Sequence, residues 1–152
     1  MSEKVKIIEC PRDAMQGIKT FIPTESKIKY LQSLLRCGFD TIDFGSFVSP
    51  KAIPQMADTA EVLAGLDLSR SQSKLLAIVA NVRGAEDACQ HDAIDYLGYP
   101  FSISENFQMR NTHKTIAESV TTLEEILNLA NAANKEVVTY ISMGFGNPYG
   151  DP

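Results

Sequence analysis

The sequence contains no tryptophan, only two histidines and only three cysteines. Cys10, Cys37 and Cys89 are far apart and odd in number, so they form neither a disulfide framework nor the close spacing of a zinc site. We therefore expect a reducing, cytoplasmic setting for this protein. Because no histidine accompanies Cys10 at a recognisable spacing, we interpret it as a structural thiol rather than a nucleophile.

Long apolar runs and an excess of basic residues are also missing. No apolar segment approaches the roughly 20 residues that span a bilayer, and the four residues before Val5 give no sign of a signal peptide. The net charge of −5 argues against nucleic acid as the main partner. We therefore expect no membrane and no nucleic acid among the partners of this protein.

What the sequence does contain is an alternation of strand-like and helix-like segments over 152 residues, the length of one domain. Strands are predicted at residues 5–8, 41–44, 75–80, 93–99 and 136–142. Helices are predicted from an N-cap at Thr24 to Gly38, and at residues 56–66, 84–90 and 121–133, the last with a capping box of Thr121 and Glu124. Residues 14–23 and 101–115 are predicted to be long loops. This alternation indicates an α/β fold with parallel strands and helical crossovers.

Polar residues follow the carboxyl end of each predicted strand, where α/β folds carry their active sites. They are Arg12, Asp13, Ser46, Ser49, Asn81, Ser102, Ser104 and Asn147. A (β/α)8 barrel needs eight strands and about 250 residues, and only five strands are predicted here. The residues alone therefore leave two folds open, an open parallel sheet and the first part of a barrel.

The pair Arg12-Asp13, directly after the first strand, has the clearest chemical potential. A carboxylate can bind a hard divalent cation, and a guanidinium can stabilise a developing oxyanion. The alternative is a surface ion pair that closes a turn, because such pairs are common and stabilise little.

Four segments resemble the hydroxymethylglutaryl-CoA lyase family in its order and spacing. They are IIECPRDAMQ (7–16), FGSFVSPKAIPQM (44–56), ISENFQMRNTHKTIAES (103–119) and YISMGFGNPYG (140–150). The resemblance implies a parallel (β/α)8 TIM barrel, of which residues 1–152 supply the first five β/α units as the N-terminal part of one catalytic domain. It also implies a divalent-metal-dependent carbon-carbon lyase that cleaves 3-hydroxy-3-methylglutaryl-CoA to acetyl-CoA and acetoacetate.

The same resemblance implies roles for individual residues. Arg12 and Asp43 are the expected catalytic residues: Arg12 stabilises the enolate, and Asp43 stands where the family has an active-site glutamate. Asp13 is the expected ligand of Mg²⁺ or Mn²⁺. Four residues are expected to bind the acyl-CoA substrate: Gln16, Ser46, Asn81 and Ser104. Each also has a structural alternative, as a loop cap, a turn residue or the end of a strand.

The metal site expected from this resemblance is incomplete in the sequence. The family completes it with a His-x-His pair on a later strand, whereas His91 and His113 are isolated here. One carboxylate cannot hold Mg²⁺ or Mn²⁺ tightly against water, so we expect the chain alone to be inactive. Two alternatives stay open: another aldolase or acyl-CoA condensing enzyme of the same superfamily, and a non-catalytic barrel fragment. The expected partners are an acyl-CoA and either a second copy of the chain or the remainder of the barrel.

Overall fold

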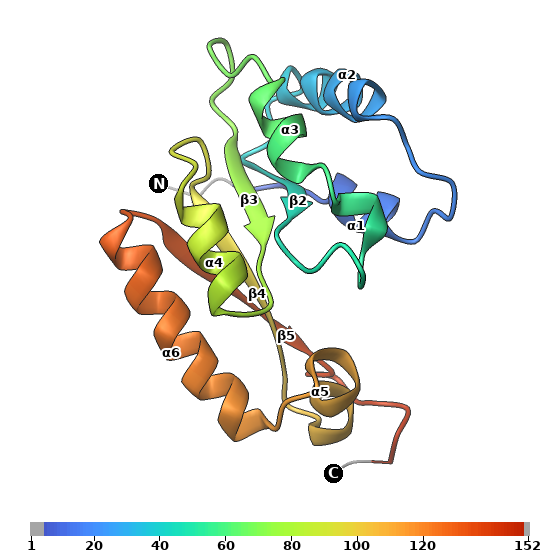
Figure 1. Cartoon of the computed structure of the whole chain (residues 1–152), viewed down its shortest axis with the longest axis vertical. Coiled ribbons are helices and arrows are strands. Elements are labelled where there is room, and N and C mark those ends of the chain that lie inside the picture. The colour runs from blue at the N-terminus through green and yellow to red at the C-terminus, as the bar shows by residue number, and fades with distance from the viewer. Residues whose placement is uncertain (1–4, 151–152) are drawn as a thin grey trace.

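The computed structural model describes residues 5–150, and their five strands form one parallel sheet. The strands lie in the order β1-β2-β3-β4-β5, which is their order along the chain (Figure 1). Their bounds are β1 Ile8–Glu9, β2 Thr41–Ser46, β3 Lys74–Ile78, β4 Tyr96–Ser102 and β5 Glu136–Ser142. A doubly wound sheet reverses its strand order at a switch point, and this sheet does not. The fold is therefore a half-barrel, the first portion of a TIM barrel.

Helices connect the strands and cover one face of the sheet. The other face corresponds to the interior of a complete TIM barrel. α2 packs beside α3, and α4 beside α6 (Figure 1). The bounds are α1 Pro11–Gln16, α2 Thr24–Leu35, α3 Thr59–Ala64, α4 Val82–Cys89, α5 Glu105–Thr112 and α6 Ile116–Ala132, with a short 3₁₀ helix, η1, at Pro54–Met56. None of the helices within residues 5–150 has the length and apolar character that crossing a membrane requires.

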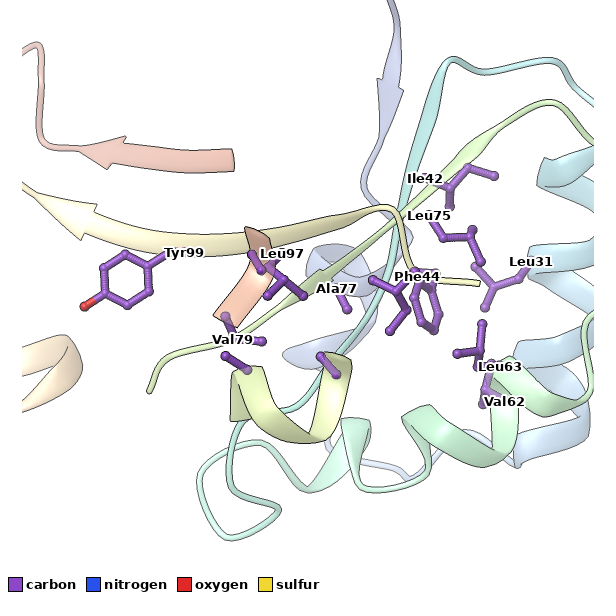
Figure 2. Packing of buried hydrophobic residues seen from close by; sticks show 14 of the residues in the cluster. Leu31, Ile42, Phe44, Val62, Leu63, Leu75, Ala77, Val79, Leu97 and Tyr99 are labelled. Atoms are coloured by element: carbon purple, nitrogen blue, oxygen red, sulfur yellow. The ribbon is translucent and has the colours of Figure 1, made fainter. Parts of the chain in front are cut away.

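The hydrophobic core lies between the helices and one face of the sheet (Figure 2). Alternate residues of β2 to β4 point into it, as the two-residue period of a strand requires. The main buried side chains are Leu31, Ile42, Phe44, Val62, Leu63, Leu75, Ala77, Val79, Leu97 and Tyr99. The residues between them, such as Asp43, Leu76 and Gly98, therefore lie on the opposite face, which is the inner face of the barrel.

A bulge in β2 changes which of its residues reach that inner face. Asp43 pairs with Leu76, but Gly45 pairs with Ala77 and Ser46 with Ile78, so one residue is inserted on β2. Without the bulge, Ser46 would share the core face with Phe44. The insertion moves Ser46 to the same face as Asp43, which is how bulges commonly redirect side chains near functional sites.

Two segments predicted as loops are helical. α1 begins at Pro11, so Arg12 and Asp13 lie within its first turn rather than at the start of a loop. Proline at the first helical position loses no hydrogen bond and has the φ angle of a helix. α5 begins after Ser104, whose hydroxyl accepts a hydrogen bond from the backbone N–H of Phe107 at 3.2 Å. Both helices are short and polar outside, and hydrophobic periodicity detects such helices poorly.

The predicted helix starts also need correction. Pro23 occupies the N-cap position of α2, and the hydroxyl of Thr24 donates to Asp58 Oδ2 at 2.8 Å instead of capping the helix. α6 begins at Ile116 with a capping box of Thr115 and Glu118, not of Thr121 and Glu124. The two Thr-x-x-Glu patterns are equivalent in sequence. The structure uses the one that lengthens the helix, because α6 then packs its buried face on β4 and β5.

Other element boundaries also differ from the prediction, most clearly in β4, in the helix predicted at 56–66 and in β1. β4 does not end before Pro100 but continues to Ser102, because β3 pairs with it only as far as Gly98 and leaves that side of β4 open to proline. The helix predicted at 56–66 is divided into η1 and α3, and Val62 and Leu63 are the buried hydrophobic residues of α3. β1 is two residues long rather than four. The prediction of β5 at residues 136–142 is confirmed.

Gly98 is the tightest position on the inner face of the sheet. A Cβ atom there would lie 2.5 Å from Ile78 Cδ1, 2.8 Å from Leu76 Cδ2 and 3.1 Å from Tyr140 Cε2. We expect Gly98→Ala to lower the free energy of unfolding by about 1–3 kcal/mol, the usual cost of overpacking. Urea unfolding measures this change. Gly144→Ala is the control, because a Cβ there meets nothing closer than 3.8 Å; equal effects of the two substitutions would refute the steric argument.

Candidate active site

The first turns of α1 bring three of the predicted site residues together. Arg12 Nη1 donates to Gln16 Oε1 at 2.9 Å and to Asp13 Oδ1 at 3.2 Å. Gln16 Nε2 also donates to Asp13 Oδ1, at 3.0 Å. Residues three and four apart are neighbours on a helix surface, so helix formation itself creates this network. A loop over the same residues would not have fixed it.

A fourth predicted residue joins the network from β2. Arg12 Nη2 donates to Asp43 Oδ2 at 2.6 Å, and Arg12 Nε lies 3.1 and 3.2 Å from the two carboxylate oxygens. The side chain of Asp43 is 0% exposed and that of Arg12 is 11% exposed. The contact is therefore a buried, two-pronged ion pair, the geometry in which arginine and carboxylate bind most strongly. Arg12 therefore has a buried partner in addition to Asp13, which is 65% exposed and forms the surface pair given as the alternative.

Burial and charge act in opposite directions on this pair. Burial raises the pKa of Asp43, while the hydrogen bonds and positive charge of Arg12 lower it, and the net direction is upward. Burial alone would lower the pKa of Arg12, but its hydrogen bonds to Asp43 and the negative charge there outweigh burial and raise it. The guanidinium thus stays charged, while the Asp43 carboxylate accepts a proton more readily than an exposed aspartate. These are the properties of a charge stabiliser and of a proton acceptor.

Tyr140 lies beside this ion pair and was not predicted from the sequence. Tyr140 is on β5 and pairs with Pro100 of β4, just as Val138 pairs with Gly98. Because Gly98 faces the interior and residues two apart share a face, Tyr140 also lies on the inner face. Burial, and next the negative charge of Asp43, raises the pKa of Tyr140 to about 12. Its hydroxyl is buried and has no hydrogen-bond partner among residues 5–150. The two-residue period of the predicted strand 136–142 was the signal that could have placed Tyr140 inside the barrel.

Ser46 and Asn81 lie together in a pocket of about 320 Å³ between the loops that follow β2 and β3. Asn81 is the N-cap of α4, where its Oδ1 accepts from Gly84 N at 2.9 Å. The hydroxyl of Ser46 accepts from Val48 N at 3.2 Å. Both side chains therefore have a local structural role as well. Arg12, Asp13 and Gln16 are not among the residues that line this pocket, so the ion pair and the pocket are adjacent features joined through β2.

The remaining predicted residues have separate positions. Ser104 is buried at the N-terminus of α5, outside that pocket. The carboxylate of Glu105, the first residue of α5, accepts from Ile116 N at the start of α6 at 3.0 Å. The thiol of Cys10 has a pKa raised first by desolvation and then by the charge of Asp43. A raised thiol pKa disfavours the reactive thiolate, in agreement with a structural rather than nucleophilic cysteine.

A divalent metal fits these residues only in part. Within residues 5–150 there is no group of three or more histidine, cysteine, aspartate or glutamate side chains that could hold a metal ion. Asp13 is an exposed carboxylate at the edge of the network and remains the candidate ligand. Mg²⁺ needs about six oxygen ligands in near-octahedral geometry. Residues 5–150 therefore do not form a complete site by themselves.

No protein-family model matches the chain, but curated relatives and solved structures do. It is 37% identical to the mitochondrial hydroxymethylglutaryl-CoA lyase of Bos taurus over 148 residues, which are 97% of this chain and 45% of the relative. It is 36% identical to hydroxymethylglutaryl-CoA lyase YngG of Bacillus subtilis over 148 residues, 97% of this chain and 49% of the relative. The chain thus spans about half the length of the relatives it matches.

The solved structures agree with these sequence relatives. The HMG-CoA lyase structure from Bacillus subtilis superposes with a TM-score of 0.91 at 36% identity, covering 99% of this chain and 50% of that one. An HMG-CoA lyase from Acinetobacter baumannii, in complex with coenzyme A and 3-methylmalate, superposes with a TM-score of 0.87 at 31% identity. The match covers 95% of this chain and 47% of that one. The resemblance is confirmed: nearly the whole chain corresponds to an N-terminal portion of hydroxymethylglutaryl-CoA lyases, and its half-barrel to the first portion of their TIM barrel.

Proposed function

We propose that this chain is part of a carbon-carbon lyase that cleaves 3-hydroxy-3-methylglutaryl-CoA to acetyl-CoA and acetoacetate. The observation that carries the proposal is the buried Arg12–Asp43 ion pair, which Asp13 and Gln16 extend toward solvent. Relatives with that activity in their names match almost the whole chain. The pair combines a fixed positive charge with a carboxylate of raised pKa, as the reaction requires.

The proposed chemistry separates into two charge movements. The 3-hydroxyl of the substrate loses its proton to Asp43 as the carbonyl of acetoacetate forms. The electron pair of the breaking carbon-carbon bond moves into the thioester, giving the enolate of acetyl-CoA. Arg12 stabilises the negative charge on the enolate oxygen, because its guanidinium is held in place before the reaction begins. A proton then returns to the enolate carbon and completes acetyl-CoA.

The substrate class is proposed from the pocket that Ser46 and Asn81 share. Ser46, which lines this pocket, is on β2, the strand that also carries Asp43. A structural neighbour binds coenzyme A and 3-methylmalate, which supports an acyl-CoA in this region. We place the acyl group toward the Arg12–Asp43 pair and the thioester arm toward the pocket. Gln16 and Ser104 remain proposed substrate-binding residues.

We also propose that further β/α units complete the barrel. The strands β1 and β5 are the edges of the described sheet, and Ile8 and Ile141 on them are exposed. Unpaired edges attract other strands. The covering units belong either to the same polypeptide or to a partner chain, and the intact mass of the native gene product distinguishes the two. A mass near twice 16.7 kDa would place them in the same polypeptide.

The test of the proposed function uses the protein at the length that its source makes, here called the native-length protein. We expect it to release acetoacetate from 3-hydroxy-3-methylglutaryl-CoA when Mg²⁺ or Mn²⁺ is present. The same assay includes 3-hydroxy-3-isohexenylglutaryl-CoA, because one relative carries that substrate in its name as well. A native-length protein that cleaves neither thioester, yet condenses or cleaves other acyl-CoA compounds, would favour the aldolase or condensing-enzyme alternative.

Metal affinity provides a separate prediction for the 152-residue chain by itself. Asp13 is the one candidate ligand in the network. We therefore expect a Kd for Mn²⁺ above about 1 mM, as for an isolated carboxylate. Calorimetric titration with Mn²⁺ measures the affinity. Micromolar binding by the 152-residue chain would contradict the partial site described above.

A further inference from the structure

The phenol of Tyr140 occupies a place on the inner face that the backbone leaves for it. Gly98 lies on β4 two residues before Pro100, the pairing partner of Tyr140, and a Cβ at Gly98 would lie 3.1 Å from Tyr140 Cε2. The same Cβ would also meet Leu76 and Ile78, which form the apolar floor of the inner face. The absence of a side chain at residue 98 therefore allows the ring of Tyr140 to lie against the sheet.

The hydroxyl of Tyr140 is the unusual part of this arrangement. It is buried, yet it makes no hydrogen bond within residues 5–150. Buried hydroxyls are nearly always paired, and an unpaired one destabilises the folded protein. Tyr99 is the ordinary case in the same sheet: it is also buried, and its hydroxyl donates to the backbone carbonyl of Ser119 at 3.2 Å.

The charges near Tyr140 indicate what kind of group the hydroxyl would meet. The negative charges of Asp43 and Asp13 and the positive charge of Arg12 all act on it. The phenol remains protonated at neutral pH because its pKa is about 12. It can therefore act as a hydrogen-bond donor, and an oxygen acceptor is the partner that it lacks within residues 5–150.

We propose that Tyr140 is a substrate-binding residue, whose hydroxyl donates a hydrogen bond to an oxygen of the bound acyl group. This inference rests on the proposed function, because the acyl group of a 3-hydroxy-3-methylglutaryl thioester supplies hydroxyl, carboxylate and carbonyl oxygens. Within residues 5–150 the hydroxyl has no hydrogen-bond partner, and the bound substrate supplies one. Gly98 is the positioning residue that leaves room for the ring.

The proposal predicts opposite effects of Tyr140→Phe on stability and on binding. In the native-length protein without ligand, the urea midpoint of Tyr140→Phe should equal or exceed that of the wild type, because the substitution breaks no hydrogen bond to residues 5–150. The Kd for 3-hydroxy-3-methylglutaryl-CoA, measured by calorimetry without divalent metal so that cleavage does not proceed, should rise about 2- to 12-fold, the value of one hydrogen bond.

Tyr99→Phe is the matched control, since it removes the same atom from a paired hydroxyl on the other face of the sheet. It should lower the urea midpoint and leave the Kd unchanged. A lower midpoint for Tyr140→Phe together with an unchanged Kd would overturn the inference and leave the proposed function intact. If the wild-type protein itself bound no thioester, the proposed function would fail, and the inference would fall with it.

Discussion

Replacing Arg12 by glutamine is expected to lower kcat/KM for cleavage of 3-hydroxy-3-methylglutaryl-CoA by about 100- to 1,000-fold in the native-length protein, as removal of a fixed oxyanion donor does in other enzymes. Glutamine keeps a polar side chain of similar reach but removes the positive charge. The substitution also leaves the carboxylate of Asp43, which is 0% exposed, without its partner. Loss of one partner of a buried ion pair costs about 3–5 kcal/mol of stability. Activity and unfolding must therefore be measured together.

A second substitution separates the two effects. In the double variant Arg12→Gln, Asp43→Asn, the unpaired buried carboxylate is gone, so stability should recover most of the loss while activity stays low. Arg36→Gln, at an exposed arginine on the end of α2, is the control for the loss of one positive charge. If the double variant regained activity along with stability, Arg12 would have only a structural role.

Lys27→Met is expected to be among the most destabilising single substitutions in the chain. Lys27 is 2% exposed, and its Nζ donates to Asp58 Oδ1 at 2.6 Å and to the backbone carbonyl of Gln55 at 2.5 Å. The ammonium also lies 4.2 Å from the centre of the Phe21 ring. Methionine leaves the buried carboxylate of Asp58 with only the Thr24 hydroxyl. We expect the free energy of unfolding to fall by about 3–5 kcal/mol, as it does when a buried pair is broken.

The matched control is Lys29→Met, because Lys29 is exposed on the same helix. Surface substitutions usually change stability by no more than about 0.5 kcal/mol. Equilibrium unfolding in guanidinium chloride measures both variants. Similar small losses for Lys27→Met and Lys29→Met would show that the buried pair contributes little. The loss at Lys27 matters for the site, because the neighbouring Gln55 side chain holds the loop that follows α1.

That loop connection shows how the fold positions Arg12 and Asp13. Gln55 Oε1 accepts from Ile22 N at 2.8 Å, and its Nε2 donates to the carbonyls of Ile18 and Thr20 at 2.9 and 3.0 Å. These bonds fasten the segment between α1 and α2 to η1. Gln55 belongs to the segment 44–56, one of the four in which the sequence resembles the lyase family. Its observed contacts are with backbone groups, so its role in this structure is to hold the loop.

Local pattern was sufficient for part of this structure. A strand was predicted at 75–80, where all six residues are apolar, and Leu75 to Val79 are buried, as expected for a strand covered on both faces. Residues 136–142 form β5 as predicted. The polar residues that follow the strands predicted that the candidate site lies at the carboxyl ends of the strands. Patterns of this kind are local, and they depend only on which residues a strand or helix must bury.

Other features depended on competition between neighbouring parts of the chain. Two Thr-x-x-Glu patterns could cap α6, and packing on β4 and β5 selected the earlier one. Pro100 predicted the end of a strand, but the early end of β3 leaves that side of β4 unpaired and allows the strand to continue. The bulge in β2 places Ser46 on the inner face. A regular strand, in which side chains alternate between faces, would place Ser46 on the core face. None of these outcomes is visible within one segment.

The sequence by itself determined the α/β class, the Arg12-Asp13 pair and the family resemblance, because these follow from residue type, spacing and short motifs. The resemblance in turn supplied Gln16 and Asp43 as candidate residues. Only the tertiary structure decided which of them meet. Asp43 lies 31 positions beyond Arg12, and their contact requires β1 and β2 to pair in one register. The same applies to the burial of Lys27 and the unpaired hydroxyl of Tyr140. Burial and pairing depend on atoms brought together from distant segments, and no single segment of the sequence contains that information.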